Sequence, residues 1–203
     1  MPRLRTSRLL DPLRHANWLT RDRAVAWGTV LLIEELLFFV FLIMWNHGTF
    51  VSIGNGGSSD FVSFFAAGKL ALDGNPALAY DQAAHFLAQK QAAGTDGPYQ
   101  YFFYPPVFLM VCALLARLPY FVAFVVFQVA TLVPFALVTR RILGERDWRW
   151  LAPLLAFPAV FWTMGLGQNS FLTAALFGGF TLLVDRRPIG AGVLLGMICY
   201  KMG

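Results

Sequence analysis

Apolar residues in this chain fall in long runs that short polar connections interrupt. Four runs come close to the roughly 20 residues that a helix needs to cross a bilayer; they cover residues 24–45, 120–139, 150–165 and 170–184. A fifth apolar run starts at Ile189 and ends near Met202. The pattern predicts an all-α polytopic membrane protein with about five transmembrane helices.

The segment between the first two spans, residues 46–119, has a helical pattern of its own. From Asp60 onward, the apolar positions follow helical spacing, at Phe61, Phe64, Phe65, Gly68 and Leu72. This spacing predicts a helix with one apolar face that rests on the bilayer or on the other helices. Ser58 and Ser59 precede it and can cap its first turn.

Turn and cap residues divide the rest of this segment. Residues 73–76 predict a turn, and Asp81 can cap a second short helix that ends near Gly94. An aromatic stretch at residues 99–104 is typical of a membrane interface, and Pro105 and Pro106 predict the start of another helix.

Residues 105–118 are the ambiguous part of the topology. At about 14 residues the stretch is short for a span. If it crossed the membrane, the arginines that follow residue 139 would lie outside, against the positive-inside rule. We therefore expect it to be re-entrant or to lie along the outer interface.

Charge sets the orientation and excludes a soluble domain. Apolar residues make up 58% of the chain and charged residues only 13%, which is unlike a soluble globular protein. Six arginines precede residue 24, against two aspartates, so we expect a basic cytoplasmic N-terminus at residues 1–23 and a membrane domain at 24–203. The predicted location is the plasma (inner) membrane, with residues 46–119 outside. The excess positive charge marks topology, and no nucleic acid is expected as a partner.

Asp60 is the candidate for acid–base chemistry. A carboxylate at the membrane surface beside an aromatic helix could take a proton from a hydroxyl of a lipid-borne substrate, if a low dielectric raises its pKa. The alternative is structural, because carboxylates in the first turn of a helix stabilise it through the helix dipole.

Other polar residues also allow two interpretations. Glu34 and Glu35 lie within the first span, where a charge is costly and indicates function; they could instead pair with groups of further spans or lie near the inner surface. Gln168 and Asn169 could bind sugar hydroxyls or cap a helix, and Lys201 could meet a phosphate or snorkel. Cys112 and Cys199 lie in apolar stretches and are expected to pack rather than to form a disulfide or a metal site.

An ordered set of short motifs resembles glycosyltransferase family 87. The motifs are Ser59-Asp60-Phe61, Ala67-Gly68, residues 72–76, Tyr80-Asp81, Tyr104-Pro105-Pro106, Leu118-Pro119, Gly167-Gln168-Asn169, Pro188 with Ala191-Gly192, and Tyr200-Lys201. Members are polytopic type C glycosyltransferases and include polyprenyl-phosphate-mannose-dependent mannosyltransferases. Where the family usually has a proline after the lysine, this chain has Met202.

The resemblance implies transfer of a hexose, typically mannose, from a polyprenyl-phosphate donor to a lipid or glycan hydroxyl at the outer membrane face. Asp60 matches the family's outer-loop acid, the expected general base. No cofactor or metal is expected. The candidate substrate-binding residues are Lys69, Tyr80, Asp81, Tyr104, Gln168, Asn169 and Lys201.

Family members are considerably longer than 203 residues and have more spans. We therefore expect an N-terminal fragment that is inactive alone. Two alternative functions remain: a transporter or flippase subunit that works through Glu34 and Glu35, and a non-catalytic membrane remnant. We find no internal repeat, which a transporter would favour.

Overall fold

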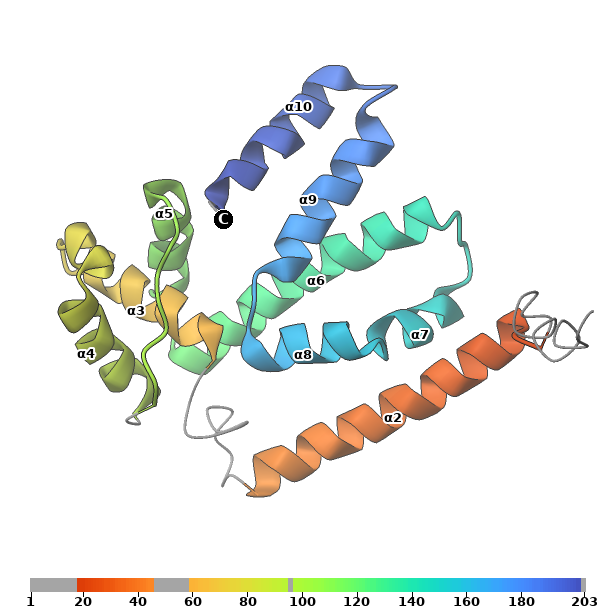
Figure 1. The fold of residues 1–203 in the computed structure, drawn as a ribbon, viewed down its shortest axis with the longest axis horizontal. Coiled ribbons are helices and arrows are strands. Elements are labelled where there is room, and N and C mark those ends of the chain that lie inside the picture. Colours follow the sequence, from red (N-terminus) through yellow and green to blue (C-terminus); the bar gives the residue numbers. More distant parts are fainter. Residues whose placement is uncertain (1–17, 46–58, 95–96, 202–203) are drawn as a thin grey trace, which may run out of the picture.

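A computed structural model describes residues 18–45, 59–94 and 97–201 of the chain, and every regular element in them is helical (Figure 1). The elements are α2 (Arg21–Trp45), α3 (Asp60–Leu72), η2 (Pro76–Tyr80), α4 (Gln82–Ala93), α5 (Pro106–Leu115), α6 (Tyr120–Ile142), η3 (Trp148–Trp150), α7 (Leu151–Leu155), α8 (Pro158–Leu166), α9 (Ser170–Leu183), α10 (Pro188–Met197) and η4 (Ile198–Tyr200). The predicted all-α membrane class is confirmed. Most of the basic N-terminus, residues 46–57 of the predicted outer loop and the predicted cap Ser58 lie outside the described residues.

Within the described residues, two helices, α2 and α6, are long and apolar enough to cross a membrane, or three spans result if the bent pair of α7 and α8 counts as one. The expected number was about five. Helix α9 has 14 residues and α10 has 10, which at 1.5 Å per residue gives about 21 Å and 15 Å, less than a hydrocarbon core of about 30 Å. Helix α5, with 10 residues, is also shorter than the core, and whether it is re-entrant or interfacial stays a prediction.

The predicted span at residues 150–165 is not one continuous helix. Helices η3 and α7 are separated from α8 by a short break, and the two parts meet at 72°. Pro158 explains the break, because a proline disfavours helical geometry in the residue before it. Phe157 is accordingly extended, with ψ of 125°.

Helix α2 stands largely apart from the other helices (Figure 1). Its main neighbour is α7, where Gly28 lies so close that an added Cβ would be 2.6 Å from the Cα of Pro153. At its start, Arg21 forms an ion pair with Glu145, in the connection between α6 and η3. Trp27 and Leu37 are 64% and 65% exposed, so most of the apolar surface of α2 is left for lipid.

Helix α3 lies within the buried hydrophobic cluster of the described residues, enclosed by α4, α5, η2 and the start of α6. All residues from Phe61 to Gly68 are buried, so the expectation of a single apolar face is wrong: neighbours cover the helix on several sides. Phe61 is fully buried and its ring packs against those of Phe64, Phe65, Tyr120, Phe124 and Phe127. Aromatic packing of this kind fixes both the position and the rotation of α3.

Glycine allows the close approach of α3 and α5. A Cβ on Gly68 would lie 2.2 Å from the carbonyl oxygen of Cys112, so this position on α3 excludes any larger residue unless the helices separate. Cys112 is buried, as its apolar context predicted, whereas Cys199 is exposed; Cys199 therefore does not contribute to the core as expected.

Most of the predicted turns and caps around α4 and α5 are confirmed. Asp81 Oδ1 accepts a hydrogen bond of 2.9 Å from the Ala84 amide at the start of α4, and Gly94 ends that helix with φ of 65°. The turn before η2 has Gly74 at φ of 81°, and α5 starts at Pro106.

Candidate functional site

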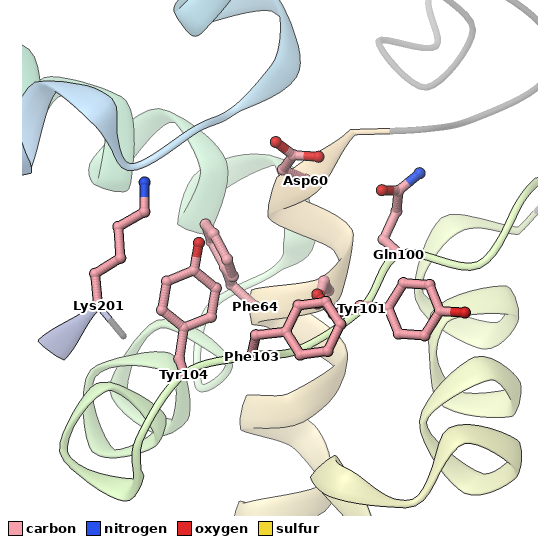
Figure 2. Close-up of a pocket in the computed structure, with 8 residues that line it drawn as sticks. Asp60, Phe64, Gln100, Tyr101, Phe103, Tyr104 and Lys201 are labelled. Carbon is pink, nitrogen blue, oxygen red and sulfur yellow. The ribbon is translucent and has the colours of Figure 1, made fainter. Parts of the chain in front are cut away.

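Asp60, Tyr104 and Lys201, three of the predicted site residues, line a half-open cavity of about 340 Å³ at the start of α3 (Figure 2). It is lined by Asp60, Ser63, Phe64, Gln100, Tyr101, Phe103, Tyr104 and Lys201. These residues come from three separate parts of the chain: α3, the extended segment before α5, and the residue after η4. The volume lies in the range typical of small-molecule sites.

Asp60 is positioned by the first turn of α3. Ser59 occupies the N-cap position, but its hydroxyl does not cap the helix as predicted; it donates a 3.0 Å hydrogen bond to the carbonyl oxygen of Leu166. This bond joins the start of α3 to the end of α8. It also gives a partner to a carbonyl that would otherwise be unsatisfied at a helix C-terminus.

The turn after α8 brings Gln168 to Asp60. Gly167 has φ of 67°, and a Cβ there would lie 2.7 Å from the Cβ of Phe61, so glycine satisfies both the left-handed backbone and the close contact. The next residue, Gln168, hydrogen-bonds the Asp60 carboxylate. Gln168 Oε1 accepts a 3.4 Å hydrogen bond from the Ser170 hydroxyl, which leaves the amide nitrogen to donate to Asp60.

Burial and charge act in opposite directions on Asp60. The carboxyl group is half-buried, and this desolvation raises its pKa above the ordinary value of 3.8. The hydrogen bond from Gln168 and the positive charge of Lys201 oppose the rise without cancelling it. A carboxylate with a raised pKa is a stronger base than an exposed aspartate, as proton abstraction requires.

Tyr104 lines the cavity, and its hydroxyl lies close to Asn169 at the start of α9. Burial raises the pKa of its hydroxyl, so the group remains protonated at neutral pH and can donate a hydrogen bond. Asn169, almost fully buried, lies beside this hydroxyl, and its Nδ2 has no well-formed hydrogen bond among the described residues. Tyr200 donates to the Asn169 carbonyl oxygen at 3.2 Å, which fixes the turn that holds Gln168 and Asn169.

Lys201 supplies the positive charge of the cavity. It follows η4, and Figure 2 shows its ammonium group on the same side of the cavity as the Tyr104 hydroxyl and the Asp60 carboxylate. Tyr200, the residue before it, is anchored by a 2.7 Å hydrogen bond to the Thr173 hydroxyl. The lysine backbone is therefore held in place although its side chain is exposed.

Only Tyr104 and Lys201 of the predicted substrate contacts line the cavity; Gln168 and Asn169 lie behind the lining, and the other three lie elsewhere. Asp81 caps α4, and Lys69 is an exposed residue on α3 with its ammonium 5.6 Å from the Phe65 ring centroid. The Tyr80 hydroxyl donates a 2.9 Å hydrogen bond to the carbonyl oxygen of Tyr104. Tyr80 thus supports a lining residue and does not line the cavity.

Sequence reasoning missed several lining residues. Tyr101 and Phe103 were expected only as part of an aromatic interface, but their rings stack 5.0 Å apart at the cavity. Ser63 and Gln100 had no signal of their own; Ser63 lies one turn after Asp60 on the same helix, and that spacing could have indicated it.

Glu35 provides a contrast on α2. Its Oε2 is shielded from solvent and has no hydrogen bond within the described residues. Asp60 lines a cavity, whereas neither Glu34 nor Glu35 lines any of the five cavities described for this part of the chain. The described ranges also contain no group of three His, Cys, Asp or Glu side chains that could hold a metal.

Comparison with known proteins gives one match. The model of glycosyltransferase family 87 matches residues 102–201. This region includes Tyr104, Gln168, Asn169 and Lys201, but not Asp60. No curated protein and no solved structure matches the chain significantly.

Proposed function

We propose that this chain, whose residues 102–201 match the model of glycosyltransferase family 87, forms part of a membrane glycosyltransferase in which Asp60 is the general base. One observation supports the proposal above the others: α3 packs so that Asp60, from outside the matched region, meets Gln168 and Lys201 from inside it. A carboxylate that merely capped a helix would not require two partners from a distant segment.

The proposed reaction is a displacement at the anomeric carbon of a donor sugar. The Asp60 carboxylate takes the proton of the acceptor hydroxyl as the oxygen of that hydroxyl bonds to the anomeric carbon. The bond from that carbon to the phosphate oxygen breaks, and the phosphate keeps the electron pair. Gln168 keeps the carboxylate oriented through its hydrogen bond.

The donor in this proposal is a polyprenyl-phosphate hexose, with mannose as the first candidate. The ammonium group of Lys201 suits a phosphate. Next to it, an apolar cavity of about 250 Å³ lies between α5, α9 and α10, and its lining includes Pro105 and Tyr200, the neighbours in sequence of Tyr104 and Lys201. A charged head beside an apolar space suits a lipid phosphate better than a nucleotide sugar.

The proposed topology places the cavity on the outer side of the plasma membrane and the N-terminus in the cytoplasm. The ion pair between Arg21 and Glu145 joins the start of α2 to the arginine-rich connection after α6. Both lie at the opposite end of α6 from the cavity (Figure 1). A basic side opposite the site agrees with the positive-inside rule.

The test is sugar transfer in membranes that contain the protein produced from its complete gene. Labelled polyprenyl-phosphate mannose is supplied as donor, and Asp60→Asn is compared with the unaltered protein. Loss of a general base should lower the rate by about 100-fold or more. The control is Asp73→Asn, which removes an exposed carboxylate just after the other end of α3. Transfer that persists in Asp60→Asn would exclude Asp60 as the base.

The same variant separates the base from a helix cap. Because the pKa of Asp60 is raised in the folded protein, its ionised form costs stability at pH values above the ordinary pKa, and this cost disappears as the pH falls and the group is protonated. Asp60→Asn removes the cost, so the variant should unfold at the same temperature as the unaltered protein or higher. A carboxylate that only stabilised the helix dipole would instead cost about 0.3–1 kcal/mol when removed.

A further inference from the structure

One wall of the cavity is a segment without regular secondary structure that runs beside α3 (Figure 2). Residues 99–104, here called the strap, include four of the lining residues: Gln100, Tyr101, Phe103 and Tyr104. An extended segment outside a sheet has no backbone ladder to hold it. In this protein, side chains of neighbouring helices provide the missing partners.

Gln89 on α4 holds the strap through both halves of its amide. Its Oε1 accepts a 3.0 Å hydrogen bond from the Gln100 backbone amide, and its Nε2 donates to the Gln100 carbonyl oxygen. The side chain thus pairs with one residue of the strap as a neighbouring strand would. Gln89 is buried, so water cannot easily replace either bond.

His85, one turn earlier on α4, extends this contact to α3. Its Nε2 lies 3.0 Å from the carbonyl oxygen of Ser63, which can only accept, so Nε2 carries the proton. Its Nδ1 is then the acceptor for the Tyr99 hydroxyl at 3.1 Å. Ser63 completes the connection, since its hydroxyl donates a 3.1 Å hydrogen bond to the Tyr101 carbonyl oxygen.

The ionisable groups around this cluster favour its neutral form. His85 is fully buried, and desolvation lowers its pKa. Burial also raises the pKa of Tyr99, so the tyrosine keeps its proton and donates it to His85. No carboxylate forms a hydrogen bond or ion pair with the imidazole among the described residues.

We propose that Gln89 and His85 are positioning residues that hold the strap, and with it the stacked rings of Tyr101 and Phe103, at the distance from Asp60 that the substrate requires. The proposal rests on the proposed function, because the strap matters for catalysis only if the cavity binds a substrate. Neither residue lines the cavity. They act by fixing the strap, which forms one wall of the cavity that Asp60 also lines.

The experiment compares Gln89→Met with Gln91→Met. Methionine at position 89 keeps the length of the side chain and removes both hydrogen bonds to Gln100. Gln91 is on the same helix but exposed, and the same substitution there serves as control. The steady-state constants for transfer are measured in membranes that contain the full-length protein, with the amount of folded protein determined for each variant.

We expect a KM for the labelled lipid-phosphate sugar about tenfold higher in Gln89→Met, as the loss of two buried hydrogen bonds implies, with kcat per folded molecule within about twofold and the acidic limb of the pH profile unmoved. His85→Gln, which keeps a donor for the Ser63 carbonyl, should give a smaller rise and remains informative if Gln89→Met folds poorly. Gln91→Met should match the unaltered protein.

The results that would contradict the positioning proposal can be told apart from those that would contradict the proposed function. An unchanged KM in both Gln89→Met and His85→Gln, with rates that only follow the amount of folded protein, would show a purely structural role and overturn the positioning proposal alone. No transfer by the unaltered protein would overturn the proposed function, and the positioning proposal with it.

Discussion

Helices α2 and α3 are both rich in apolar residues, and each carries a carboxylate: Glu35 lies within α2, and Asp60 begins α3. Their surroundings nevertheless differ. Helix α2 leaves most of its surface exposed and contacts mainly α7. Helix α3 is buried among several neighbours. The apolar surface of α2 is left exposed and that of α3 is covered by protein, so similar hydrophobicity in sequence corresponds to two different kinds of surroundings.

The two carboxylates show what this difference means for function. Glu35 is shielded, but it lines none of the cavities described for residues 18–45, 59–94 and 97–201, and its Oε2 has no hydrogen bond within them. Asp60 adjoins a cavity, accepts a hydrogen bond from Gln168 and lies in the field of Lys201. Shielding alone therefore does not identify a site. The convergence of partners from distant segments is what makes Asp60 the stronger candidate.

The largest expected difference between the two helices is in stability. Phe61→Ala on α3 should lower the free energy of unfolding by about 3–5 kcal/mol, because it leaves a cavity among five aromatic rings. Leu37→Ala on α2 removes a side chain that is 65% exposed and should have a much smaller effect.

Denaturant or thermal unfolding of both variants in the same detergent measures this difference. Detergent replaces lipid around α2 but cannot replace the protein neighbours of α3. Equal losses in the two variants would contradict the view that α3, and not α2, belongs to the protein core.

The sequence predicted the elements near the site better than it predicted the spans. Asp81, Gly94 and Pro106 delimit α4 and α5 as expected, because caps and prolines act locally. The break before Pro158 was also a local signal, but the apolar run around it obscured the signal. The lengths of α9 and α10 depend on turns that hydropathy alone does not reveal.

The candidate site was predictable only in part for the same reason. Asp60, Tyr104, Gln168, Asn169 and Lys201 were singled out from sequence, and the structure brings them together. Lys69 and Asp81 were expected beside them and lie elsewhere, because a residue list carries no information on which face of a helix meets the cavity. The bonds of His85 and Gln89 to the strap join residues without a shared motif, so only the structure could show them.

A smaller effect, on the pH dependence of transfer, should distinguish Lys201, whose charge acts on Asp60, from Lys69 on α3. Lys201 lowers the pKa of Asp60, so Lys201→Gln should raise it further. A base works only when ionised, and transfer is lost as the pH falls through its pKa. The acidic limb of kcat/KM should therefore lie above the ordinary aspartate value of 3.8 in the unaltered protein, and at still higher pH in Lys201→Gln, by up to about one pH unit.

Lys69→Gln is the matched control for this shift. It removes a lysine of the same charge, exposed on α3 and absent from the lining of the cavity. Its acidic limb should coincide with that of the unaltered protein. A limb that moves equally in both variants would point to the general charge of the surface and not to a pairing of Lys201 with Asp60.

The smallest expected effect concerns α2 and the alternative of a transporter. In a glycosyltransferase that uses Asp60, the combined Glu34→Gln and Glu35→Gln variant should transfer labelled sugar at the rate of the unaltered protein, because amides of nearly the same shape replace carboxylates outside the described cavities. In a transporter or flippase subunit, the same change would abolish movement of the substrate, since charged groups within a span are the usual carriers of coupling. Measuring transfer and transmembrane movement of the lipid-linked sugar in the same vesicles separates the two. Loss of movement with transfer absent throughout would assign the working carboxylates to α2 and reverse the contrast with α3.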